Sequence, residues 1–137
     1  MTPATFARLE RLVELRRQRE ALALAQIHQG LQSIADQSAA ARAAAAPAPP
    51  EEGPIPPWHY RTLADLQVWE AHRQRELQAA FEALGKQLPE AEDRLREARA
   101  TVEAMDLLGK RVARTAAIRK ARKDDLAAAA EAANRPK

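Results

Sequence analysis

A regular repeat of apolar residues in the second half of the chain is the feature that most constrains its fold. The repeat advances by alternating steps of four and three residues, without a slip, over more than five heptads. An average step of 3.5 residues keeps one stripe of a helix against a partner helix, so it predicts a long left-handed coiled coil. The stripe consists of Leu77, Phe81, Leu84, Leu88, Ala91, Leu95, Ala98, Val102, Met105, Gly109, Val112 and Ala116.

The composition favours an all-α chain. Of its 137 residues, 46% are hydrophobic but only 4% are aromatic, because most of the apolar content is Ala and Leu. These are strong helix formers that fill a narrow strip, and no segment alternates with the period of two that a strand requires. We therefore expect an all-α fold without strands.

Several functional classes are excluded by what the sequence lacks. It contains no cysteine, which excludes disulfides, thiolate metal sites and cysteine nucleophiles. No stretch approaches the roughly 20 apolar residues that span a bilayer, and residues 1–20 are too charged for a secretory signal. We expect a soluble intracellular protein.

Prolines divide the predicted helices. The first helix is expected from about 3 to 45, after Thr2-Pro3, with Thr5 as a competing cap. Residues 46–57 are rich in proline and form the turn, and the second helix follows over about 58–133, with a possible kink at Pro89. The short turn predicts a two-helix antiparallel coiled-coil hairpin with a longer second helix, although a linker between separately docked helices is the alternative.

Two details of this hairpin follow from its pattern. In the first helix, Arg16 and Glu20 share the phase of Phe6 and Ile27, so the stripe either carries a charged layer or shifts register, and we favour the shift. The second helix is longer, so its part after about Arg99 should lack a partner within the chain. That part would leave apolar residues exposed, namely Val102, Met105, Val112 and Leu126.

No catalytic, cofactor-binding or metal site is predicted. His28, His59 and His72 lack the spacing of metal ligands, and His72 with Glu76 is typical of a solvated helix face. Ser33 and Ser38 have no paired base, and Gly85-Lys86 lacks the other residues of a phosphate loop. We expect no enzyme, no small-molecule substrate and no cofactor.

Charge and aromatic residues suggest partner-binding segments. Residues 1–45 and 101–137 have an excess of Lys and Arg, whereas 46–100 have an excess of Asp and Glu. The densest basic segment has no aromatic residues to stack on bases, so we do not expect nucleic acid as its main partner, and any such binding would depend largely on phosphates. Trp58, Tyr60 and Trp69 either anchor an interface or pack over the turn. The basic segment consists of Lys110, Arg111, Arg114, Arg119, Lys120, Arg122 and Lys123.

The layout resembles the FliJ/YscO family of stalk proteins in bacterial flagellar and virulence type III export machines. The resemblance rests on LERLVELRRQRE at Leu9 to Glu20, on the unequal hairpin, and on KRVARTAAIRKARKDDLAAAAE at Lys110 to Glu131. It implies a non-enzymatic cytoplasmic protein, peripheral to the inner-membrane export apparatus and in contact with the membrane only indirectly. Such a stalk binds the central pore of the hexameric export ATPase, links it to the export gate protein, and sometimes escorts export chaperones.

The resemblance also implies two groups of contact residues. The residues facing the ATPase pore would be Arg8, Arg11, Arg16, Arg17, Arg111, Arg114, Arg119 and Arg122. Those facing the export gate would be Trp58, Tyr60, Leu66 and Trp69. Two other functions stay open: a coiled-coil scaffold or nucleic-acid-binding protein that uses its basic arm, and a homodimeric coiled coil whose overhanging helices pair.

Overall fold

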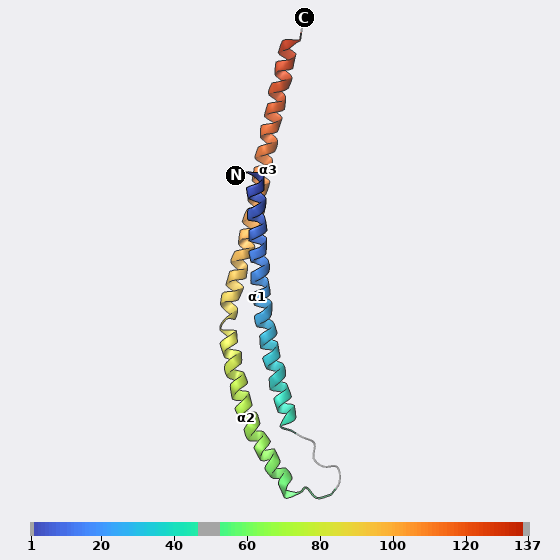
Figure 1. The fold of residues 1–137 in the computed structure, drawn as a ribbon, viewed down its shortest axis with the longest axis vertical. Coiled ribbons are helices and arrows are strands. Elements are labelled where there is room, and N and C mark those ends of the chain that lie inside the picture. The colour runs from blue at the N-terminus through green and yellow to red at the C-terminus, as the bar shows by residue number, and fades with distance from the viewer. Residues whose placement is uncertain (1, 47–52, 136–137) are drawn as a thin grey trace. The chain divides into compact units, whose positions relative to one another are not determined.

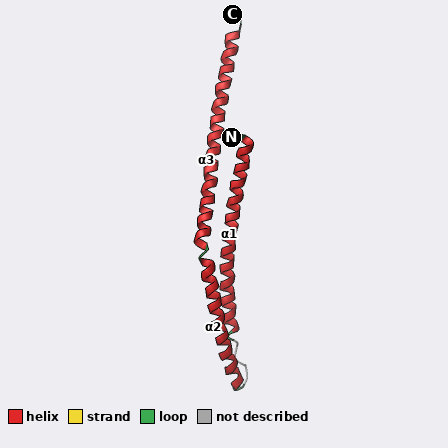
Figure 2. Cartoon of the chain, turned by 60° about the vertical axis from the view of Figure 1, so that its left-hand side comes forward, coloured by secondary structure: helices red, strands yellow, loops and turns green. Residues whose placement is uncertain are grey.

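The computed structural model describes residues 2–46 and 53–135, and these ranges are helical apart from short connections. Helix α1 runs Pro3–Ala44, α2 runs Pro57–Gly85 and α3 runs Leu88–Asn134 (Figures 1 and 2). Within the described ranges there is no strand. The all-α class is therefore confirmed, as is a second helical stretch that is longer than the first and bent. Part of the predicted turn, residues 47–52, lies outside the described residues.

The first helix begins at the proline that the sequence indicated. The Thr5 amide donates a hydrogen bond to Thr2 Oγ1 over 3.2 Å, so Thr2, and not Thr5, caps α1. Pro3 occupies the first helical position, where its missing N–H would have no partner in the helix. At the start of α2, Pro57 has the same role after an extended Pro56.

The bend in the second helical stretch is a short break between α2 and α3. Lys86 and Gln87 form a turn, and Pro89 falls in the first turn of α3. Proline cannot donate to the carbonyl four residues before it and its ring clashes there, so the helix is interrupted ahead of Pro89. The apolar stripe nevertheless continues across the break, because Leu84, Leu88 and Ala91 all remain partly or fully buried.

Contacts divide the chain into two compact units, each built from segments of different helices. The terminal unit comprises residues 1–18 and 96–137, and the central unit comprises residues 19–95.

The central unit is held by a narrow core and by polar contacts between helices. Gly30 leaves room for Leu84, since a Cβ at position 30 would lie 2.7 Å from Leu84 Cδ2. Ser38 Oγ donates to Gln74 Oε1 (2.5 Å), and Gln74 Nε2 donates to the Ser38 carbonyl (3.0 Å). The buried residues of this unit are Ile27, Ala41, Ala45, His59, Leu77, Ala91 and Leu95.

The predicted register shift in α1 is wrong, because charged residues occupy the stripe itself. The inward positions advance by four and three residues without interruption, and Arg17 and Glu20 are among them. Glu20 retains 19% of its side-chain exposure and is paired with Arg94 (3.3 Å). Such a layer is tolerated because the buried charge has an opposite charge beside it. These inward positions are Val13, Arg17, Glu20, Leu24, Ile27, Leu31 and Ile34.

The terminal unit pairs the start of α1 with the middle of α3. The Phe6 ring lies against Gly109, where a Cβ would be 3.0 Å from Phe6 Cζ. Val102 and Met105 are half-buried, so the expectation that they are exposed is wrong, because the start of α1 covers them. Every residue from 110 to 135 is exposed, including Val112 and Leu126. We call this segment, 110–135, the free arm.

Candidate partner-binding surfaces

The structure brings all eight arginines implied for the ATPase pore into the terminal unit. Four lie in the first five turns of α1, and four lie in the free arm of α3. None of the eight belongs to the central unit. Arginines that are far apart in the sequence therefore share one part of the fold.

The four arginines of α1 are not equally available. Arg8 and Arg11 are exposed, whereas Arg16 lies 3.6 Å from Glu97 of α3. Arg17 is half-buried and donates to Glu14 through Nε and Nη2, the latter over 2.6 Å. This hydrogen bond lowers the pKa of Glu14 and raises the pKa of Arg17. Arg17 is thus engaged within α1, and its spacing of three residues from Glu14 was the sequence signal for this pair.

The cations of the free arm surround the helix. Seven Lys and Arg residues fall between positions 110 and 123, with no Asp or Glu among them. At about 100° per residue, Lys110 and Arg114 lie on one side of the helix, and Arg119 and Lys123 lie on the other. The two sides between these pairs are also basic: one carries Arg111 and Arg122, and the other carries Lys120. Residues 110–123 of the arm therefore present positive charge in every direction and have no single basic face, whereas Asp124, Asp125 and Glu131 follow in the rest of the arm.

The four residues implied for the export gate all lie in the first turns of α2, in the central unit. Trp58, Tyr60 and Trp69 are exposed, and Leu66 is half-buried. The ring buried at this end is His59, whose centroid lies 6.0 Å from that of Trp58, edge to face. Sequence reasoning missed His59 as a packing residue. Leu63 follows it by four residues and Leu66 follows Leu63 by three, so this heptad spacing was the available signal.

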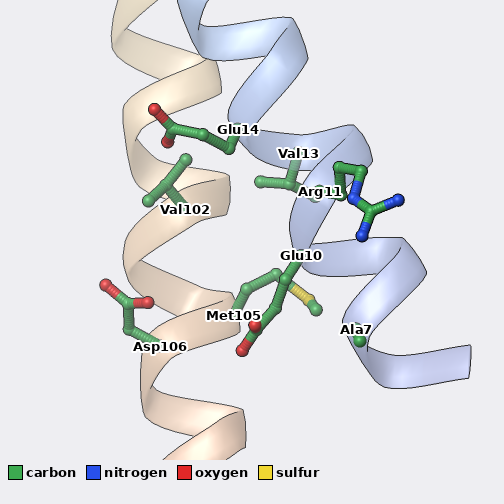
Figure 3. A pocket seen from close by; sticks show the side chains of 8 residues that line it. All are labelled: Ala7, Glu10, Arg11, Val13, Glu14, Val102, Met105 and Asp106. Atoms are coloured by element: carbon green, nitrogen blue, oxygen red, sulfur yellow. The ribbon is translucent and has the colours of Figure 1, made fainter. Parts of the chain in front are cut away.

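Between its helices, the terminal unit forms a depression with a polar edge (Figure 3). Val13 and Met105 extend toward the facing helix, and the carboxylates of Glu10, Glu14 and Asp106 border the depression. In the described parts of the chain, no group of three or more His, Asp or Glu residues is arranged to hold a metal ion.

The remaining predicted positions have ordinary surroundings. His72 Nε2 lies 3.0 Å from Glu76 Oε1 on an exposed face, one helical turn apart. Ser38 is engaged with Gln74, as described above, and Gly85 has open space around it. Among the helices of the described residues, none combines the length and apolarity needed to cross a bilayer.

Comparisons of the chain with protein-family models, with curated proteins and with solved structures give no match.

Proposed function

We propose that this chain is an antiparallel coiled-coil hairpin that serves as the stalk of a type III protein export machine. It would bind within the pore of the hexameric export ATPase and link that ring to the export gate, without hydrolysing anything itself. In this proposal it works in the cytoplasm, at the periphery of the inner-membrane apparatus, and can also escort export chaperones.

The pairing in the proposal is supported by contacts within each unit. In the central unit the contacts join Glu20 to Arg94, Gly30 to Leu84 and Ser38 to Gln74. The residue numbers increase along α1 while those of the contacted residues decrease, which is the order of an antiparallel pair. In the terminal unit Phe6 contacts Gly109 and Arg16 pairs with Glu97, so the contacts follow the same antiparallel order. Burial also follows the steps of four and three that a coiled coil requires.

The observation that carries the functional proposal is the free arm. The arm is exposed along its whole length, and its basic part, residues 110–123, is positive on every side. Such a helix is poorly suited to a flat surface, which would meet only part of its charge. A ring of acidic loops around the arm would meet all of it. Such charges guide association and orientation more than they add affinity.

The aromatic end of the central unit is the proposed gate contact. Trp58, Tyr60 and Trp69 expose large rings at the start of α2 while His59 is buried beside them. Exposed Trp and Tyr side chains are frequent anchors of protein interfaces. The two proposed contacts then belong to different units of the chain.

The proposal is tested by reversing charge in the arm. Arg114, Arg119 and Arg122, each changed to Glu, should abolish binding to the export ATPase of the same genome while helicity is unchanged. The matched control changes Arg42, Arg61 and Arg75, exposed arginines of the central unit, to Glu and should bind as the wild type does. Equal loss in both triple variants would reject the arm as the contact.

The second candidate function is binding of nucleic acid by the same arm, which the seven cations of residues 110–123 favour. That reading predicts an affinity for duplex DNA that falls steeply with salt and shows little sequence preference. Tight DNA binding together with no ATPase binding would replace the stalk proposal with this one.

A further inference from the structure

One side of the terminal unit carries a row of apolar residues on each of its two helices. On α1, Leu9, Leu12 and Arg16 are spaced by three and four residues, so they share one side of the helix. On α3, Glu97, Ala104 and Leu108 share a side in the same way. The contact between Arg16 and Glu97 shows that the two rows lie on the same side of the unit.

This side is exposed and differs from the opposite one. Leu12 is 61% exposed and Leu108 is 39% exposed, and Ala104 and Leu108 line a shallow depression of α3 together with Leu107 and Arg111. Leu107 lies about 100° round the helix from Leu108, on the side turned away from α1. The opposite side is bordered by Glu10, Glu14 and Asp106, with Arg11 beside them (Figure 3). We call Leu9, Leu12, Ala104 and Leu108 the leucine face.

The border of the leucine face is mainly basic. Arg8 and Arg16 flank it on α1, and Arg111 and Arg114 flank it on α3. The nearby carboxylates are Glu97, which already pairs with Arg16, and Glu103. An apolar strip across two neighbouring helices is a surface on which a third helix packs, and the arginines would pair with acidic residues flanking that helix's own apolar stripe.

We propose that the leucine face binds an amphipathic helix of a partner protein, with leucine-type residues on its apolar stripe and Glu or Asp beside them. A second copy of this chain fits less well, because a two-fold pairing of leucine faces would bring their basic borders together. An anionic membrane would attract the arginines, but the apolar area is confined to about three helical turns on two helices. The inference does not require the export function, because the leucines of this face are not part of the proposed pore contact. Its basic border does share Arg8, Arg16, Arg111 and Arg114 with that contact.

The test uses two synthetic helical peptides of about 20 residues, long enough to hold a helix. Both carry the same leucine stripe, but one has Glu beside it and the other has Lys. Binding to the full chain is measured by fluorescence anisotropy. We expect the Glu peptide to bind about tenfold more tightly than the Lys peptide.

Two matched variants separate the leucine face from general charge attraction. Leu12→Ser with Leu108→Ser keeps every charge and should weaken binding of the Glu peptide about tenfold. Leu22→Ser with Val68→Ser removes two apolar residues of the central unit that are at least as exposed as Leu108, and it should leave binding unchanged. Circular dichroism checks that both variants remain helical.

Four results would overturn the inference. The Glu peptide does not bind, or the Leu12/Leu108 variant binds it as the wild type does. Alternatively, sedimentation reveals a dimer of the wild type that this variant abolishes, which assigns the face to a second copy. Finally, vesicles containing about 30% phosphatidylserine bind the wild type and not the variant, and the Glu peptide does not bind. That result assigns the leucine face to a membrane.

Discussion

At the scale of single residues, the absence of a side chain at Gly30 determines how closely the helices of the central unit approach. Leu84 occupies the space that a Cβ at position 30 would need. Gly85, by contrast, has nothing near its Cβ position and no positive φ. The two glycines therefore offer a matched pair for testing the packing.

Gly30→Leu should lower the free energy of unfolding by about 1–3 kcal/mol, because the added side chain overpacks the site of Leu84. Gly85→Leu should change that free energy by less than about 1 kcal/mol, since the new side chain meets open space. Urea unfolding followed by circular dichroism measures both. Equal destabilisation by the two variants would contradict the observed contact between Gly30 and Leu84.

The ion pair of Glu14 and Arg17 predicts a pH effect at one carboxyl group. The hydrogen bond from Arg17 lowers the pKa of Glu14, so the pair is present above the unfolded pKa and is lost as the pH falls through the lower folded pKa. Arg17→Gln should return the Glu14 pKa toward its ordinary value. Carbon-13 NMR titration of the Glu14 carboxyl measures this, and an identical pKa in the wild type and the variant would refute the pairing.

At the scale of helices, sequence patterns predicted most elements, and the exceptions have physical reasons. The heptad stripe indicated the inward positions of α3 as far as Gly109, and Thr2-Pro3 indicated the start of α1. Hydrophobic periodicity could not reveal that Glu20 faces inward within the apolar stripe of α1. The residue that neutralises it, Arg94, is 74 residues away in sequence. It also could not reveal that Phe6 extends the paired region past Met105.

Pro89 is responsible for the break between α2 and α3. Pro89→Ala would supply the missing amide and remove the ring, so Lys86 and Gln87 should become helical and join α2 to α3. Carbon-13 chemical shifts of residues 85–89 report this directly. Shifts that keep their turn values in the variant would mean that Gly85 to Gln87, and not Pro89, cause the break.

The free arm should behave as a helix without tertiary support. Amides of residues 111–133 should exchange with solvent far faster than those of residues 91–105, because no side chain of the arm is buried. Removing residues 110–137 should leave the urea midpoint nearly unchanged. Strong protection of the arm in the isolated chain would indicate that it already has a partner, such as a second copy.

At the scale of the whole molecule, the two proposed contacts fall in separate units, which the sequence alone did not predict. The resemblance implied the pore arginines and the gate residues. That the arginines belong to one unit and the gate residues to the other depends on which segments pack together. Sequence reasoning did not identify the leucine face, because its members lie near positions 9 and 108 and are brought together only by packing. The basic character of the arm, by contrast, was visible in the sequence because it is local.

The measurement that tests the central claim most directly is reconstitution with the export ATPase from the same genome. The purified ATPase is mixed with the full chain or with the chain lacking residues 110–137, and ring assembly and ATP turnover are recorded. The account predicts that the full chain promotes assembly and turnover and that the shortened chain, still folded by circular dichroism, does not. Equal stimulation by both chains, or no effect of the full chain, would contradict it.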